Sequence, residues 1–182
     1  MMIYFTSDEH YFHKNIIKYQ KRPFQSLEDM HRELIRRHNH VVKGEDQVYH
    51  IGDFCFGKKK QAREITLQLN GTHFFLQGNH DKWDKSLTQI IELRERKDDN
   101  QESNLIVLCH YAMRVWNESH YNSWQLHGHT HRHLKPIGKQ LDVGVDCHNY
   151  YPISIEVVKE IMKTREDNWN KIDKNREGAV FV

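Results

Sequence analysis

The sequence predicts an α/β protein in which two packed β-sheets are flanked by helices. Short apolar runs that end in polar residues indicate strands, and amphipathic helical segments lie between them in the first half of the chain. The later part is richer in strand-like runs, which indicates a second sheet. A length of 182 residues suits one domain, and no repeat or low-complexity linker divides it. We therefore predict a single domain over residues 1–182, with its core over about 1–163 and a polar tail over 164–182 that lies as a helix on the surface.

Five segments are typical of strands that end in polar residues. Each is mainly apolar, β-branched or aromatic and then reaches Asp, Asn or His. The five segments are residues 3–8, 48–53, 73–79, 105–110 and 124–129. Residues 141–146 alternate as a further strand, and residues 90–96 and 105–109 predict a hairpin around a polar turn over 97–104.

Helical periodicity lies between these strands. Ser26 is followed by acidic residues and is a typical N-cap, so we expect a helix from there to about residue 38. Residues 61–69 predict a second helix, which an Asn-Gly pair ends. We expect a third, short helix after Trp83 and a fourth from Ser154 to about Lys163.

Seven residues of types that bind divalent metals occur where the strand-like runs end. They are Asp8, His10, Asp53, Asn79, His110, His129 and His131. In open α/β sheets the carboxyl ends of the strands share the edge where ligands bind, so these side chains can converge on one polynuclear metal site. Any one of them alone would more often be a surface histidine or a turn aspartate. Five such strand ends together favour the metal site.

The types of donor atom indicate which ions would bind. Carboxylate, amide and imidazole groups suit manganese, iron, zinc, nickel or cobalt, whereas a calcium site would consist mostly of oxygen. We expect two divalent ions, with manganese favoured. Two-metal hydrolases hold their ions roughly 3.5–4 Å apart, so one carboxylate must bridge. Asp53 is the expected bridge, because Gly52 lets the backbone come close and Asp8 already has a chelating neighbour in His10.

In order along the chain, these motifs resemble the five blocks of the calcineurin-like metallophosphoesterase superfamily. The blocks are Asp8-Glu9-His10, Gly52-Asp53, Gly78-Asn79-His80-Asp81, His110 and Gly128-His129-Thr130-His131, within about residues 1–155. The resemblance implies a four-layer αββα sandwich. It also implies two ligand sets that share Asp53. One set is Asp8, His10, Asp53 and His131, and the other is Asp53, Asn79, His110 and His129.

The same resemblance implies that His80 is a catalytic acid that helps the leaving group depart. In many phosphoprotein phosphatases the Gly-Asp block continues with a second Asp that orients this histidine, whereas here the chain continues Phe54-Cys55-Phe56. This departure weakens the likeness to protein phosphatases. The segment from Phe12 to Phe24 resembles a compact bacterial and phage branch of the superfamily.

The expected function is hydrolysis of a phosphate ester through attack by a metal-activated hydroxide, without a covalent protein intermediate. A short chain without a cap leaves the site open, which favours a phosphodiester of a nucleotide or of a small flexible substrate. The alternatives are a phosphomonoesterase, a nuclease subunit, and a non-catalytic interaction scaffold on the same fold. The scaffold is disfavoured because no ligand position is lost, and the nuclease because the chain has no marked basic stripe.

Two further residues are candidates for contact with the substrate. His13 follows the first ligand pair closely enough to lie at the mouth of the site. Arg22, before Pro23, offers a planar guanidinium group for phosphate oxygens.

Composition limits the partners and the compartment. The chain has 27 Lys and Arg against 25 Asp and Glu, so no broad basic surface for duplex nucleic acid is expected. The amino terminus lacks the pattern of a secretory signal, and no apolar run approaches the length of a membrane span. The cysteines Cys55, Cys109 and Cys147 are odd in number and lack metal-site spacing, which favours a reducing compartment. We expect a cytoplasmic protein with a small phosphorylated substrate such as a nucleotide, and the oligomeric state stays open.

Overall fold

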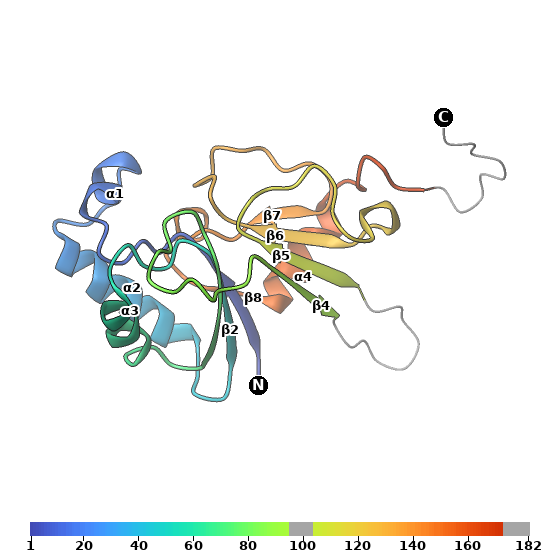
Figure 1. Ribbon diagram of the computed structural model, residues 1–182. Coiled ribbons are helices and arrows are strands. Elements are labelled where there is room, and N and C mark those ends of the chain that lie inside the picture. Colours follow the sequence, from blue (N-terminus) through green and yellow to red (C-terminus); the bar gives the residue numbers. More distant parts are fainter. Residues whose placement is uncertain (95–103, 173–182) are drawn as a thin grey trace.

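The computed structural model describes residues 1–94 and 104–172 and contains two four-stranded sheets (Figure 1). The first sheet has the strand order β3-β2-β1-β8. Its strands are β1 Ile3–Thr6, β2 Gln47–Ile51, β3 Thr72–Leu76 and β8 Ile153–Ser154. The second sheet has the order β4-β5-β6-β7. Its strands are β4 Ile90–Arg94, β5 Leu105–Cys109, β6 Trp124–His127 and β7 Gln140–Asp142.

The helices flank these sheets, which confirms the predicted α/β class. They are α1 Lys14–Tyr19, α2 Leu27–Val41, α3 Lys59–Thr66 and α4 Ile155–Thr164, with the 3-10 turns η1 Ser119–Tyr121 and η2 Val145–Cys147. Figure 1 shows α1, α2 and α3 beyond the first sheet, on the side away from the second. The hydroxyl oxygens of Ser26 and Ser154 accept backbone N–H groups in the first turns of α2 and α4, as the sequence predicts. No helix in residues 1–94 or 104–172 is long and apolar enough to cross a membrane.

Two apolar clusters hold the layers together. The core between the sheets combines residues of both sheets with one face of α4, and includes Phe5, Ile51, Leu108, Leu126 and Val158. A second cluster joins α2 and α3 to the other face of the first sheet and includes Met30, Leu34, Phe54 and Ile65. Each fully buried side chain of this kind stabilises the fold by about 1.5–3 kcal/mol. Their packing fixes the strand ends relative to one another.

The strand directions bring the polar strand ends to a common edge. Strands β1, β2 and β3 are parallel, and so are β5, β6 and β7, whereas β8 and β4 are antiparallel to their neighbours. The loops that leave β1 and β2 are hydrogen-bonded to each other, because the Asp8 N–H donates to Gly52 O at 3.1 Å and the His10 N–H to Asp53 O at 3.0 Å. A bridge between Ser7 and Gly144 joins the end of β1 to the chain that follows β7.

Several expected elements differ from those observed. The strand expected over 141–146 ends at Asp142, because the chain turns into η2 after Gly144. The helix expected over 61–69 is α3, which begins and ends earlier. Helix α1 was not predicted because it is only six residues long and has no side-chain cap. No helix follows Trp83; the Asp84 carboxylate accepts the Ser86 N–H in an irregular segment instead.

The predicted hairpin is confirmed in its strands, since β4 and β5 are antiparallel neighbours. Its turn falls largely on residues 95–103, which lie outside the described residues. The helical tail is wrong for residues 165–172, which are irregular. The buried Asn168 side chain donates there to the carbonyl oxygens of Ser119 and Ser123, both at 2.9 Å. Residues 173–182 are not among those described.

Candidate metal centre

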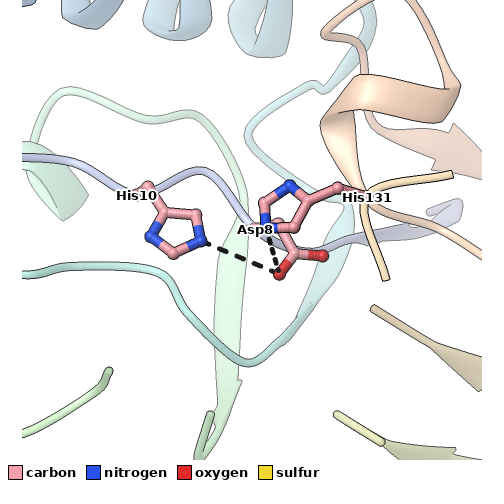
Figure 2. A group of neighbouring side chains, drawn as sticks. All are labelled: Asp8, His10 and His131. Carbon is pink, nitrogen blue, oxygen red and sulfur yellow. Dashed lines mark ion pairs between the residues drawn. The ribbon is translucent and has the colours of Figure 1, made fainter. Parts of the chain in front are cut away.

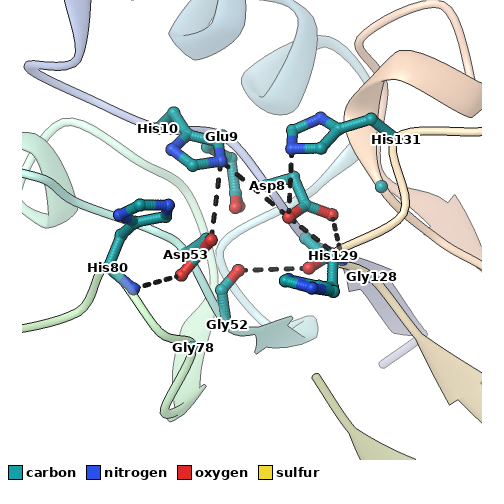
Figure 3. A network of polar contacts seen from close by, with 12 residues as sticks. Asp8, Glu9, His10, Gly52, Asp53, Gly78, His80, Gly128, His129 and His131 are labelled. Atoms are coloured by element: carbon teal, nitrogen blue, oxygen red, sulfur yellow. Dashed lines mark hydrogen bonds and ion pairs between the residues drawn. The ribbon is translucent and has the colours of Figure 1, made fainter. Parts of the chain in front are cut away.

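All seven predicted ligands lie at the carboxyl ends of the strands of both sheets. Figure 3 shows Asp8, His10, Asp53, His129 and His131 among them. Two groups are formed, and within each the ligand atoms lie within 4.8 Å of one another. The first ligand group is Asp8, His10 and His131, and the second ligand group is Asp53, His110 and His129. Asn79 adjoins the second group, because its Oδ1 lies 3.2 Å from His110 Nε2.

The first ligand group has donor atoms spaced for an ion (Figure 2). Asp8 Oδ1 lies 4.0 Å from His10 Nε2 and 3.8 Å from His131 Nε2, which is too far for good hydrogen bonds. His10 Nε2 is buried and has no hydrogen-bond partner among the described residues. Such an unpaired buried atom is rare and costly. Nitrogen and oxygen ligands lie about 2.0–2.2 Å from an ion such as zinc, so this spacing fits a cation held between the three side chains.

The second ligand group presents one ring nitrogen to two oxygens. His110 Nδ1 donates to the carbonyl oxygen of Ile51 at 2.9 Å, which leaves Nε2 as the ring atom available to a metal ion. Nε2 faces Asp53 Oδ2 at 3.4 Å and Asn79 Oδ1 at 3.2 Å. The lone pairs of these three atoms face one another. A shared positive charge, either a proton on the ring or a metal ion, would stabilise this arrangement. The ring of His129 packs edge-on against His110 with centroids 5.1 Å apart.

Asp53 lies between the two groups. Its Oδ2 is 3.6 Å from His10 Nε2 of the first group and 3.4 Å from His110 Nε2 of the second. The same oxygen therefore faces one ligand nitrogen of each group. This position supports the expectation that Asp53 bridges the two ions.

Backbone strain is concentrated at these residues. Five of the seven predicted ligands, namely Asp8, His10, Asp53, His129 and His131, have φ angles between 44° and 66°. The left-handed region is uncommon for residues other than glycine and costs on the order of 1–3 kcal/mol at each position. Such strain persists only where the surrounding structure enforces it, and it is typical of functional sites.

Two glycines let the backbone pass directly beside the carboxylates. A Cβ at Gly78 would lie 2.2 Å from Asp53 Oδ1, and one at Gly128 would lie 2.5 Å from Asp8 Oδ2. Only glycine fits at either position without displacing a ligand. The glycines of the Gly-Asn-His-Asp and Gly-His-Thr-His blocks therefore have a steric role.

Asp81 ties together the loops that carry Asp53 and Asn79. Its buried carboxylate accepts the backbone N–H groups of Asp53 at 2.6 Å, Cys55 at 3.0 Å and Gly78 at 3.0 Å. It also accepts the indole N–H of Trp83 at 2.7 Å. One side chain thus satisfies four donors and fixes the ends of β2 and β3 relative to each other.

Arg22 does not present its guanidinium group to a substrate, which corrects the sequence-based expectation. The side chain is buried and makes a two-pronged ion pair with Asp146, at 2.9 Å from Nε and 2.7 Å from Nη2. It also donates to the backbone carbonyls of Asp8 at 2.7 Å and Glu9 at 3.0 Å. Arg22 therefore fixes the backbone of the loop that carries Asp8 and His10, and its guanidinium group has no free donor face for phosphate.

Asp146 contacts both Arg22 and the predicted ligand His131. Its Oδ2 accepts Nδ1–H of His131 at 2.7 Å, so that Nε2 of the ring is turned toward Asp8. A carboxylate behind a metal-binding histidine fixes its tautomer and raises its basicity. Sequence reasoning assigned no role to Asp146 or Asp81. Asp146 ends a strand-like run, which is the same signal that identified the ligands, and Asp81 is the last residue of the Gly-Asn-His-Asp block.

The ionisable groups strongly perturb one another. Burial alone would lower the pKa of His110, but the hydrogen bond and charge of Asp53 and the charge of Asp8 raise it to about 9. Burial alone would raise the pKa of Asp53, but the neighbouring His110 and His10 lower it to about 2. Burial raises the pKa of Asp8 to about 7. Perturbations of this size in a cluster are typical of functional sites, and a bound dication would add its own charge to the balance.

His80 and His13 both lie beside the first ligand group, as expected. The backbone N–H of His80 donates to Asp53 Oδ1 at 2.8 Å. The half-buried His80 ring lies 5.4 Å from the His10 ring, measured between centroids (Figure 3). His13 Nδ1 lies 3.1 Å from His10 Nδ1, and its ring stacks on exposed Phe56 at 4.5 Å. Their roles as acid and substrate contact stay predictions.

Comparison with known proteins shows relatives without assigned activity. No protein-family model matches the chain. The uncharacterized protein MJ1445 from Methanocaldococcus jannaschii is 34% identical over 170 residues, which cover 88% of this chain and 91% of that protein. The crystal structure of AQ665 from Aquifex aeolicus, a protein of unknown function, is similar with a TM-score of 0.66. It is 23% identical, covers 88% of this chain and 98% of that one, and shows a shared fold.

Proposed function

The chain belongs to the family of the archaeal protein MJ1445, and from its site we propose that it is a phosphoric ester hydrolase that uses two divalent metal ions. The observation that carries the proposal is the pair of ligand groups joined by Asp53 Oδ2. Mixed imidazole, carboxylate and amide donors favour manganese, with iron, zinc, nickel or cobalt as alternatives. Two such ions supply an activated water and neutralise charge on phosphate oxygens.

The chain's own residues fix the geometry and move a proton. Asp146 and the Ile51 carbonyl hold His131 and His110 with their Nε2 atoms toward the site. His80 lies on the same side, with its backbone held by Asp53, and can protonate a departing alkoxide. A well-placed general acid contributes about 10²–10⁴ in rate.

A covalent route through a cysteine is disfavoured. Burial raises the pKa of the Cys55 thiol to about 11 and raises that of Cys147 further. Thiols with such pKa values stay protonated at neutral pH and are weak nucleophiles. All three cysteines are free, which suits the cytoplasmic location that we also propose.

A diester is the favoured substrate. A monoester carries a second negative charge near neutral pH, and a free guanidinium group at the mouth would stabilise it. Arg22 was the candidate for that task, but it is buried and paired with Asp146. The site is therefore better suited to the single charge of a phosphodiester in a nucleotide or another small flexible molecule.

The test combines metal stoichiometry with ester preference. Protein reconstituted with manganese should bind two ions per chain and hydrolyse bis(p-nitrophenyl) phosphate faster than p-nitrophenyl phosphate. Asp53→Asn should weaken the binding of both ions, because only Asp53 faces both ligand groups. His131→Ala should chiefly weaken the binding of one ion. Asp167→Asn, at an exposed surface aspartate, is the matched control. A stoichiometry that never exceeds one ion would contradict the binuclear site.

Other outcomes would select the alternatives. Faster hydrolysis of the monoester indicates a phosphomonoesterase. Efficient cleavage of duplex DNA at physiological salt indicates a nuclease subunit, although a net charge of +2 predicts weak binding to duplex. Two bound ions without hydrolysis of any ester in the panel would favour an interaction scaffold.

A further inference from the structure

A cavity of about 400 Å³ opens beside the second ligand group. Asn79 forms part of its wall, so a molecule with its phosphate at the metal centre reaches the cavity directly. The residues that line it include Gln77, Asn79, Gln89, Ile90, Tyr111 and Met113. Small-molecule sites typically occupy about 300–1,000 Å³, so this cavity is large enough for one part of a ligand.

The wall that carries Tyr111 is preformed. The side-chain amide of buried Gln125 donates to the Tyr111 carbonyl oxygen at 2.7 Å, and the Met113 N–H donates to Gln125 Oε1 at 3.0 Å. Buried Gln140 donates to the Met113 carbonyl oxygen and to Gln125 Oε1, both at 2.6 Å. Two buried glutamines thus fix the loop backbone, and a ligand need not order this wall when it binds.

The part of the lining that contains Gln77 and Gln89 is fixed where the chain pairs again with the end of β3. The Gln77 N–H donates to Thr88 O at 2.8 Å, and Leu76 and Thr88 form an isolated bridge. These contacts hold Gln77 and Gln89 together, with Gln89 Nε2 3.5 Å from Gln77 Oε1. Two carboxamides, each with donors and an acceptor, therefore line one side of the cavity.

The chemistry of the lining selects a neutral, flat group. None of the lining residues carries a formal charge, so the cavity offers no cation for a second phosphate and no carboxylate for an amine. Tyr111 and Ile90 are each 47% exposed and offer an aromatic face and an aliphatic surface. Carboxamides match the mixed donor and acceptor edge of a nucleobase, and an aromatic ring stacks on its face.

The aromatic wall adjoins the metal centre itself. The Tyr111 ring packs edge-on against His110 and His129, with centroids 5.2 and 5.0 Å apart. A group stacked on Tyr111 is therefore one side chain away from two candidate ligands. We propose that this cavity binds the nucleobase of the substrate, so that the substrate is a nucleotide ester; the proposal relies on the function proposed above for the position of the phosphate.

Binding measurements test the base separately from hydrolysis. The probes are adenosine 5′-monophosphate, adenosine 3′-monophosphate and ribose 5-phosphate, titrated into the manganese-loaded full chain by calorimetry. At least one adenosine ester should bind about tenfold more tightly than ribose 5-phosphate, since stacking on one aromatic ring provides an effect of this order. Equal affinities of all three probes would overturn the proposal.

Two variants locate the effect. Tyr111→Ala and Gln89→Leu should each reduce the advantage of the adenosine ester to below about threefold. Tyr121→Ala, at a tyrosine 59% exposed in η1, is the matched control and should retain it. Gln89 is exposed and its side chain is hydrogen-bonded to Gln77, which is not a candidate ligand, so its variant remains informative if Tyr111→Ala disturbs His110. An advantage that both variants retain would place the base elsewhere and contradict the proposal.

The two proposals fail in different ways. A protein that prefers adenosine esters but hydrolyses no phosphate ester would refute the proposed activity and leave this base site supported. A protein that hydrolyses bis(p-nitrophenyl) phosphate without a preference for adenosine esters would refute the base site alone.

Discussion

His131 is held from behind by two buried, oppositely charged side chains. Asp146 accepts its Nδ1–H, and Arg22 in turn pairs with Asp146. Asp146→Asn keeps the shape but removes the charge that fixes the ring. We expect metal affinity at the first ligand group to fall about 10–100-fold, as for other residues that support metal-binding histidines. Calorimetric titration with manganese measures this for each site.

The control for this prediction is Asp167→Asn, because Asp167 pairs with Lys171 on the surface. Its metal affinity should equal that of the wild type. If Asp146→Asn also bound manganese with unchanged affinity, the ion pair beneath His131 would have only a structural role.

His80 is the second residue whose role can be isolated. Its backbone is tied to Asp53, while its ring lies beside His10 without belonging to either ligand group. His80→Ala should keep both ions and lose about 10²–10⁴ in rate for alkoxide leaving groups, but much less for nitrophenolate, which departs without a proton. Rates for a series of diesters whose leaving groups differ in pKa measure this. Equal losses across the series would assign His80 to phosphate binding or to the positioning of Asn79.

The residues of this site could be predicted from sequence to different degrees. The ligands were recognisable because each combines a metal-binding side chain with the end of a strand-like run, and both signals are local. The role of Arg22 was not recognisable from the sequence, because its partner Asp146 is 124 residues away. Before the fold brings them together, an arginine near the ligand motifs is equally consistent with a phosphate contact or a buried ion pair.

At the scale of elements, the ends of β2 and β3 meet through a glycine. A Cβ at position 78 would lie 2.2 Å from Asp53 Oδ1 and 2.3 Å from the Asp53 nitrogen. Gly78→Ala should therefore displace Asp53 and reduce the manganese bound to both groups, even though the change adds only one methyl group. Gly44→Ala is the matched control, because a Cβ there meets nothing within 4 Å. Two ions bound to Gly78→Ala with wild-type affinity would show that the loop can relax.

The elements themselves were predictable where burial imposes a pattern. Strands β2, β5 and β6 were identified because their apolar runs are largely buried, and β1 and β3 because their apolar runs end in buried residues. The strand over 141–146 was predicted too long. Its alternation continues in sequence, but the Gly144 N–H donates to Asp142 Oδ1 and the chain turns into η2. That turn places Asp146 next to His131, so this error in the element is linked to the missed residue.

The packing of α2 on the first sheet should make stability depend on pH. His38 is buried there, with Nε2 2.9 Å from the Asn70 carbonyl oxygen, and burial together with the nearby His50 lowers its pKa to about 3. An unfolded chain has a histidine pKa of about 6.5, so between these values the unfolded state binds the extra proton and the free energy of unfolding falls as the pH falls. Between pH 7 and pH 5, the titration of His38 should lower the free energy of unfolding by about 2 kcal/mol.

Urea denaturation with a metal chelator present measures this contribution. His38→Gln cannot titrate and should lose less stability than the wild type between pH 7 and pH 5, whereas His133→Gln, at an exposed histidine, should behave like the wild type. Identical pH dependence in wild type and His38→Gln would mean that His38 is accessible to protons in the folded state.

At the scale of the whole molecule, each ligand group takes side chains from both sheets. In the first group, Asp8 follows β1 of the first sheet and His131 follows β6 of the second; in the second group, Asp53 follows β2 and His110 follows β5. Bound ions would therefore cross-link the two sheets at one edge, while apolar packing joins them elsewhere. Metal binding should stabilise the entire domain and not only the loops that carry the ligands.

Chelation should accordingly lower the unfolding temperature. An ion at 100 times its dissociation constant contributes about 2.7 kcal/mol to stability, and two independent ions contribute about twice that. Hydrogen exchange should increase first in residues 52–54, 78–81 and 128–131, because these loops carry or support the ligands, while β1 and β5 in the core between the sheets stay protected. Asp53→Asn, which disturbs both groups, should show little response to manganese or chelator. If chelation left both the unfolding temperature and the loop exchange of the wild type unchanged, ions would not join the two sheets, and the strain at the five left-handed ligand positions would need another cause.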